Sequence, residues 1–431
     1  MEMTENMMDA PSTSEQAMAL ENRHGAHNYH PLPVVLDRGI GVYVWDIEGK
    51  QYFDFLSAYS AVNQGHCHPA IVKAMQDQTE KLTLTSRAFY SSNLGKYEQF
   101  ITEYFGYDKV LPMNTGAEAV ETAIKIARKW AYDVKGVPNN CAKIITCLEN
   151  FHGRTTTIVS FSTDDDATGG FGPYTPGFEV IPYNDLEALK AAVADPNVAG
   201  FLVEPIQGEA GVNVPADDYI RKAHDICKEA NVLFMADEVQ TGIARTGALL
   251  ATCGNCTCSG SCERQSTFTK ADLLILGKAL SGGAYPVSAV LADDDVMSVI
   301  HPGQHGSTFG GNPVAAEVAI AALSVVRDED LALNARTLGA QFRSGIEQVA
   351  TECSLIKLVR GRGLLNAVII NDSPDSTTAW DLCVAMKDNG LLAKPTHGNI
   401  IRFAPPLVIT EEQLDDCLAI IRKTFLEFNK S

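Results

Sequence analysis

Two stretches of sequence, VLFMADEVQTG (232–242) and DLLILGKALSGG (272–283), decide the expected fold. Each begins as a short apolar run typical of a buried strand. The first run then reaches Asp237-Glu238, and the second reaches Lys278. In an open parallel sheet, ligands bind at the carboxyl ends of the strands. The two stretches therefore predict a site where a carboxylate and an amine approach one ligand from two sides.

Further strand-like runs surround these two between about residues 100 and 320, and they alternate with helical patterns such as DYIRKAHDICKEA (218–230). Such alternation is typical of a doubly wound α/β fold with a mostly parallel sheet. The other runs are KVLPMN (109–114), KIITCLE (143–149), FEVIPY (178–183) and AGFLVEP (199–205).

The rest of the chain divides around this large α/β domain, which we place at residues 61–320. Residues 1–26 are expected to be a flexible tail. Residues 27–60, which contain a hairpin pattern with a turn at Asp46–Gly49, are expected to pack with the last domain. After Val326 the pattern changes, and residues 321–431 predict a smaller α+β domain whose final helix starts at a Thr410-x-x-Gln413 capping box.

Charge and composition limit the possible functions. The net charge of −19 over 431 residues argues against a nucleic-acid surface. No apolar run is long enough to span a bilayer, so no membrane partner is expected. The first 22 residues carry five acids and no Lys or Arg, unlike a transit or signal peptide. We therefore expect a cytoplasmic protein.

Lys278 and Asp237 together suggest pyridoxal 5′-phosphate. This cofactor needs a lysine for its Schiff base and a carboxylate that keeps the pyridine nitrogen protonated. A lysine directly after an apolar strand is rare unless its amine is used. Asp237 alone could be a structural carboxylate at a strand end, and Gln240 is either a partner for a ring hydroxyl or an ordinary loop residue.

The segment NTGAEAVETAIKIARKWA (114–131) ends one strand and opens a helix. Thr115 to Glu118 form a capping box, and Gly116 allows a ligand to approach the backbone. Free N–H groups and the helix dipole favour an anion there. The segment is thus either a phosphate site or a plain capped helix.

Three other segments carry weaker signals. In ENFHGR (149–154), Phe151 could stack on a ring or belong to the core, His152 could cover the same ring, and Arg154 suits a carboxylate. Glu204 and Glu209 of VEPIQGEAG (203–211) could pair with Arg154 or Arg402, or could be solvated. The turn HGSTFGGNP (305–313) could be a plain loop.

In this order, these pieces closely resemble the class III, fold-type I pyridoxal-phosphate aminotransferases, from about Asn28 to Phe428. The segments that carry the resemblance are NYHPLPV (28–34), FDFLSAYSAVNQGHCHP (53–69), KLTLTSRAFY (81–90), LPMNTGAEAVETA (111–123), VEPIQGEAGV (203–212), ADEVQTGIARTG (236–247), LILGKALSGG (274–283) and IIRFAPPLVI (400–409).

The resemblance implies a role for each matched residue. Lys278 would form the Schiff base and Asp237 would pair with the pyridinium. The cofactor would also contact Gln240 through its ring oxygen, Phe151 by stacking, and Thr115, Gly116 and Ala117 through its phosphate. Thr308 would reach the phosphate of a neighbouring subunit, which implies a homodimer with shared active sites.

Within this family the segments are most similar to members that transfer the δ-amino group of L-ornithine to 2-oxoglutarate, giving glutamate-5-semialdehyde and glutamate. The resemblance implies that Tyr29, Tyr59 and Arg154 hold the ornithine head group. Glu209 would mask Arg402 while ornithine binds and then free it for 2-oxoglutarate. N-acetylornithine and 4-aminobutyrate remain alternative donors, and a catalytically idle cofactor-binding protein is an alternative of another class.

One segment departs from the family pattern. CGNCTCSGSC (253–262) places Cys253, Cys256, Cys258 and Cys262 at metal-like spacing in a connection longer than the family's. It is a zinc or iron–sulfur loop, a redox-sensitive loop, or an insertion with incidental thiols. Because nothing else in the chain offers support for a metal, we assign no metal site.

Overall fold

The computed structural model describes residues 10–253 and 269–429. Its central sheet has the strand order β4-β10-β9-β8-β7-β5-β6. The bounds are β4 Lys109–Met113, β5 Lys143–Cys147, β6 Phe178–Ile181, β7 Val198–Val203, β8 Leu233–Asp237, β9 Leu273–Leu276 and β10 Ser288–Ala292. All six strand-like runs of the sequence therefore form strands of one sheet, which confirms the expected mixed α/β fold.

Strand β10 was not foreseen from the sequence. It lies between β4 and β9 and pairs antiparallel with both. Because β4 is antiparallel to β10, it runs in the same direction as the parallel strands β9, β8, β7, β5 and β6. The carboxyl end of β4 therefore lies at the same sheet edge as those of β8 and β9.

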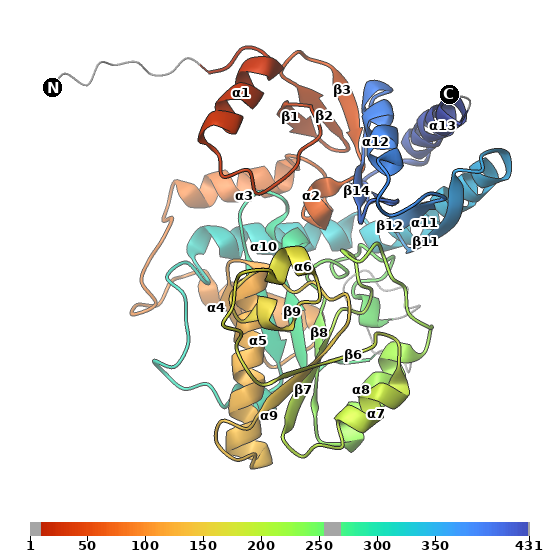
Figure 1. Cartoon of the computed structure of the whole chain (residues 1–431). Coiled ribbons are helices and arrows are strands. Elements are labelled where there is room, and N and C mark those ends of the chain that lie inside the picture. Colours follow the sequence, from red (N-terminus) through yellow and green to blue (C-terminus); the bar gives the residue numbers. More distant parts are fainter. Residues whose placement is uncertain (1–9, 254–268, 430–431) are drawn as a thin grey trace.

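Helices cover both faces of this sheet, as a doubly wound fold requires (Figure 1). On one face, α5 (Gly116–Trp130) and α9 (Asp294–Met297) pack into a core with Ile144, Leu202 and Met235. On the other face, α7 (Leu186–Ala192) and α8 (Tyr219–Glu229) pack into a core with Phe201 and Phe234. Strand side chains alternate between the two faces, so both faces of β7 and β8 are apolar.

The N-terminal segment forms a second sheet with part of the C-terminal region. Strands β1 (Leu36–Ile40), β2 (Tyr43–Asp46) and β3 (Gln51–Asp54) form antiparallel pairs, and β3 pairs in parallel with β13 (Leu391–Leu392). The hairpin expected around Asp46–Gly49 is present. Within the segment expected to be a flexible tail, residues 14–24 form α1 with Thr13 as its cap. Residues 1–9 lie outside the described part.

The C-terminal region adds a third sheet, with the order β11-β12-β15-β14. Its elements are α11 (Leu331–Glu352), β11 (Ile356–Arg362), β12 (Leu365–Ile370), α12 (Thr378–Asp388), β14 (Lys394–Thr396), β15 (Ile400–Phe403) and α13 (Glu411–Phe428). The capping box at Thr410 is confirmed. The domain boundary expected after residue 320 falls inside α10 (Pro313–Asp328), a continuous helix that joins the two regions.

The remaining helices are α2 (Ser57–Ser60), α3 (Pro69–Thr79), α4 (Leu94–Phe105) and α6 (Asp165–Thr168). Helices α3 and α4 pack against α10. No helix among the described residues has the length and apolar character needed to cross a membrane.

Candidate active site

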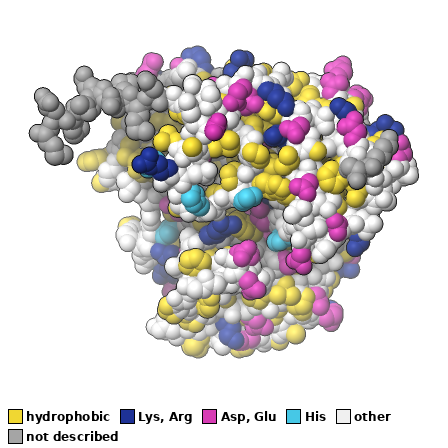
Figure 2. Space-filling model, turned by 45° about the horizontal axis from the view of Figure 1, so that its top comes forward, with side chains coloured by type: hydrophobic (Ala, Val, Ile, Leu, Met, Phe, Trp, Pro, Cys, Tyr) yellow, Lys and Arg dark blue, Asp and Glu magenta, His cyan; other side chains and the backbone are white. Residues whose placement is uncertain are grey.

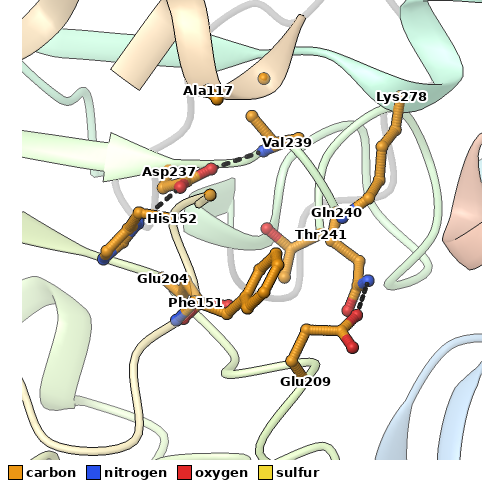
Figure 3. Close-up of a pocket in the computed structure, with 12 residues that line it drawn as sticks. Ala117, Phe151, His152, Glu204, Glu209, Asp237, Val239, Gln240, Thr241 and Lys278 are labelled. Atoms are coloured by element: carbon orange, nitrogen blue, oxygen red, sulfur yellow. Dashed lines mark hydrogen bonds and ion pairs between the residues drawn. The ribbon is translucent and has the colours of Figure 1, made fainter. Parts of the chain in front are cut away.

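Lys278 and Asp237 line the same cavity, which has a volume of about 200 Å³. Strands β8 and β9 are parallel neighbours, with Asp237 opposite Ile275, so both residues leave the sheet at one edge. Figure 3 shows Lys278 and Asp237 on different sides of the pocket. Phe151 lies in the middle of this view, and Glu209 lies below it. The paired carboxylate and amine predicted from the two strands are therefore brought together by the fold.

Asp237 is held from behind by His152. The Nδ1 atom of His152 lies 2.6 Å from Asp237 Oδ2, and the backbone N–H of Val239 donates to Asp237 Oδ1 at 3.1 Å. Burial lowers the pKa of His152, but the hydrogen bond to Asp237 and its charge outweigh that effect, so the pKa of His152 is raised. The carboxylate therefore has a fixed direction and an adjacent proton donor.

Lys278 sits in an environment that disfavours its charge. Burial lowers the pKa of Lys278, while the nearby carboxylates Glu209 and Asp237 oppose that shift without cancelling it. The backbone of Lys278 has φ +40°, a conformation that L-residues rarely adopt outside functional sites. A lysine with a lowered pKa is a better nucleophile and a better proton carrier at neutral pH.

The start of α5 forms one wall of the cavity, where Gly116 and Ala117 line it. The expected capping box is present: Thr115 Oγ1 accepts from the N–H of Glu118, and the Glu118 side chain accepts from the N–H of Thr115. A Cβ at Gly116 would lie 3.0 Å from Val239 Cγ1, so glycine keeps this wall open. The first N–H groups of this 15-residue helix could bind an anion such as a phosphate in the cavity.

Among the described residues, three buried polar atoms in or beside the cavity have no hydrogen-bond partner: Gln240 Oε1, His152 Nε2 and Arg402 Nε. Buried polar atoms normally find partners. The ring of Phe151 also lines the cavity and offers a flat face (Figure 3). A planar, hydrogen-bonding group with a phosphate fits this arrangement.

Glu209 and Arg402 form an ion pair at the edge of the cavity. Glu209 Oε1 lies 2.6 Å from Arg402 Nη1 and accepts a second hydrogen bond, 3.0 Å long, from Gln240 Nε2. Burial raises the pKa of Glu209, but the charge of Arg402 prevails and lowers it to about 2. The pair joins the loop after β7 to strand β15. Glu209 and Arg402, which the family resemblance paired as a substrate switch, are therefore in contact.

Tyr59 lies against this pair, with the Arg402 guanidinium 5.1 Å from its ring centre. Residues 57–60 form a left-handed turn with φ from +46° to +71°, which costs roughly 1–2 kcal/mol per residue. Asp54 Oδ1 stabilises the turn by accepting from the N–H groups of Leu56 and Ser57. A costly backbone that positions a side chain is typical of a functional site.

Tyr29, Arg154 and Thr308, which the sequence also assigned to the site, do not line the cavity. Tyr29 is 63% exposed and stacks under Lys394 at 5.8 Å, while exposed Arg154 lies 5.8 Å from the centre of the Phe151 ring. Both still act electrostatically on Tyr59. Thr308 is exposed on the turn before α10 and does not line the cavity. Cys256, Cys258 and Cys262 lie outside the described residues.

The structure adds cavity residues that sequence reasoning did not assign. Val239 and Thr241 line the cavity, and buried Glu204 accepts a hydrogen bond from the N–H of Phe151 at 2.9 Å. Burial raises the pKa of Glu204 to about 7. Glu204 directly follows the apolar strand β7, and the sequence offered it as a partner for Arg154 or Arg402; the structure instead places it at the cavity, bonded to the Phe151 backbone.

Figure 2 shows a hollow near the middle of one face, with histidine and basic side chains beside it. Few cofactors need an amine nucleophile, a carboxylate aimed at a ring nitrogen and an anion site together, and pyridoxal phosphate is one of them. The fold and the site therefore define a pyridoxal-phosphate-dependent enzyme of fold type I.

Comparison with known proteins narrows this class. The sequence model described as aminotransferase class-III matches residues 24–425, and the chain belongs to that family. It is similar to the mitochondrial ornithine aminotransferases of Rattus norvegicus (55% identity, covering 99% of this chain and 93% of the relative) and Drosophila melanogaster (57%, covering 97% and 93%).

Two solved structures are also similar to the whole chain. One is the ornithine aminotransferase of Toxoplasma gondii (50% identity, TM-score 0.93, covering 97% of this chain and 95% of that one). The other is the acetylornithine aminotransferase of Elizabethkingia anophelis (60% identity, TM-score 0.86, covering 97% and 100%).

Proposed function

We propose that this protein is an ornithine aminotransferase that moves the δ-amino group of L-ornithine to 2-oxoglutarate. The observation that carries the proposal is the Glu209–Arg402 ion pair, with Tyr59 against it, at the edge of the cavity that holds Lys278. Tyr29 and Arg154 both affect the pKa of Tyr59, so groups suited to an α-amino-carboxylate head lie near one another and near this ion pair.

The residues present divide the chemistry. Pyridoxal phosphate supplies an electron sink that stabilises negative charge on the substrate carbon. Lys278 carries the proton at its Nζ, and its lowered pKa keeps a larger neutral fraction at neutral pH. Asp237, held by His152, would keep a proton on the ring nitrogen of the cofactor, and Phe151 would stack on its ring and shield it from water.

The Glu209–Arg402 pair suits two different substrates. While Glu209 is ionised and paired, Arg402 does not attract the α-carboxylate of ornithine, so the δ-amine is the end that would enter the cofactor cavity. A dicarboxylate acceptor such as 2-oxoglutarate can displace Glu209 and pair with Arg402. A movable partner avoids a buried, uncompensated cation in either state.

The test uses the purified protein with bound cofactor and follows the cofactor's absorption spectrum. L-ornithine should convert the spectrum rapidly, and 2-oxoglutarate should restore it, while N-acetylornithine and 4-aminobutyrate act at least tenfold more slowly. Faster conversion by N-acetylornithine would instead favour an acetylornithine aminotransferase. That second candidate is favoured by the 60% identity to the Elizabethkingia protein.

We also propose a homodimer with shared sites. Ser307, next to Thr308, accepts a 2.7 Å hydrogen bond from Asn114 beside the phosphate wall, so this exposed turn is anchored at the site. The test mixes Thr308→Val subunits with Lys278→Ala subunits and allows them to exchange. The mixture should be more active than either variant alone, because each mixed dimer then has one site with an intact Lys278 and an intact Thr308. No gain in verified mixed dimers would contradict shared sites.

The cytoplasmic location stays a prediction; several relatives carry the word mitochondrial in their names.

A further inference from the structure

The loop that carries Glu209 is held along its backbone by the small C-terminal sheet. Thr396 Oγ1 and His397 Nε2 both bond to the Glu209 carbonyl, at 3.1 and 3.0 Å. Arg360 Nε donates to the Gly211 carbonyl at 2.8 Å, and its Nη2 donates to the Ala210 carbonyl at 3.5 Å. Three consecutive carbonyls therefore accept hydrogen bonds from side chains of one sheet and its turn.

The flanks of the loop pack on the same sheet. Ile206 and Val212, on either side of Glu209, form an apolar cluster with Leu365, Ala367 and Ala404. Gly211 lies so close to strand β15 that a Cβ there would be 2.6 Å from Ile400 Cδ1. Its φ of +88° would also strain a residue other than glycine. The contact between loop and sheet therefore has little room to adjust.

Arg402 belongs to this sheet as well. On β15 it is paired with Ala367 of β12 and with Lys394 of β14, two residues before Thr396. The partners of the ion pair are thus fixed to one frame: Arg402 by its strand, and the Glu209 backbone by Thr396, His397 and Arg360.

We propose that Thr396 and Arg360 are specificity-determining positioning residues. By fixing the Glu209 backbone, they limit the switch to rotation of the Glu209 side chain and keep Arg402 masked against the α-carboxylate of an amino-acid donor. When these bonds are lost, the Glu209 backbone drifts, the ion pair weakens, and Arg402 becomes available. This inference deepens the proposed function and rests on it for the identity of the donor.

The test compares wild type with Thr396→Val/Arg360→Met, both loaded with cofactor. Two quantities are measured: the ratio of aldehyde to 2-oxo-acid product from ¹³C-labelled ornithine, which reports δ- against α-transfer, and the Kd of glutarate, a dicarboxylate that does not react. Loss of the Thr396 and Arg360 hydrogen bonds, each worth a few-fold to about tenfold, should lower the δ:α ratio and tighten glutarate binding by about tenfold, while the His397 bond to the Glu209 carbonyl remains.

Three controls separate this role from general destabilisation. Thr396→Ser keeps the hydroxyl and should behave as wild type. Arg362→Met removes a neighbouring arginine of β11 that pairs with exposed Asp217, 3.0 Å away, and should change neither quantity. In a Glu209→Ala background the double substitution should have no further effect, because there is then no carboxylate to position.

The possible failures are distinguishable. If the wild-type protein transfers no amino group from ornithine, the proposed function is wrong. The glutarate measurements still test whether Thr396 and Arg360 position Glu209. If glutarate binding by Thr396→Val/Arg360→Met equals that of wild type, or the substitutions act equally in the Glu209→Ala background, the inference is wrong.

Discussion

The Nδ1 atom of His152 lies 2.6 Å from Oδ2 of Asp237, and both side chains are buried. The two residues are 85 positions apart in sequence. The pair points the Asp237 carboxylate into the cavity and leaves His152 Nε2 without a partner. A buried carboxylate is sensitive to the loss of such a partner, because few other groups can compensate its charge.

Replacing His152 should therefore impair the cofactor site without unfolding the protein. We expect His152→Leu to weaken cofactor binding and to lower kcat by about 10- to 100-fold, the value of a hydrogen bond to a charged group. His152→Asn, which keeps a donor, should recover part of the loss. The checks are cofactor release during dialysis and the kcat of both half-reactions. His224→Leu, beside exposed Asp225, serves as the control; equal losses in both leucine variants would rule out a special role for His152.

Lys278→Arg should keep the positive charge and remove the reactive amine. Because proton transfer by a positioned side chain contributes about 10²- to 10⁴-fold, kcat should fall by at least about 10²-fold. Steady-state rates with ornithine and circular dichroism of both proteins measure activity and folding. Lys190→Met, an exposed lysine of α7, is the matched control and should be unchanged. Full activity in Lys278→Arg would remove this lysine from the reaction.

Glu204 should make stability depend on pH. Burial raises its pKa to about 7 from 4.5, so the folded protein keeps a proton that the unfolded chain loses above pH 4.5. The contribution of Glu204 to the free energy of unfolding is therefore largest below pH 4.5. It falls as the pH rises to about 7 and does not change above that pH. The total loss is about 3 kcal/mol.

Urea unfolding of the cofactor-free protein between pH 4.5 and 8 measures this effect. The stability of Glu204→Gln relative to wild type should rise across the window and then level off. Glu187→Gln, at an exposed glutamate of α7, is the matched control. A flat difference for Glu204→Gln would mean that the carboxyl is ionised throughout.

Gly208 is expected to accept a methyl group only at a cost, for a steric reason. A Cβ there would lie 1.4 Å from Oε1 of Gln240, so Gly208→Ala must displace the amide that bonds to Glu209. We expect a loss of about 1–3 kcal/mol in the free energy of unfolding, as for other overpacked sites, and a lower δ:α product ratio. Gly306→Ala, where nothing lies within 4 Å, is the control. Wild-type values for Gly208→Ala would show that Gln240 can move freely.

Much of the site could be predicted because it depends on local rules. Asp237 and Lys278 end adjacent parallel strands, and parallel strands place their carboxyl ends at one edge. The capping box at Thr115 is likewise a pattern of consecutive residues, and the structure confirms it. Strand β10 escaped notice because its five residues, SAVLA, give no periodic signal apart from their antiparallel partners.

The amino-acid sequence by itself determined the α/β fold, the strand-end pair Asp237 and Lys278, and the capped start of α5, because apolar runs, capping boxes and strand direction act over short distances. Only the tertiary structure decided that His152 supports Asp237, that residues 57–60 turn left-handed to present Tyr59, and that Thr396 and Arg360 hold the Glu209 backbone. These arrangements depend on contacts between residues far apart in the chain, and no local pattern encodes their distances or the backbone strain they offset.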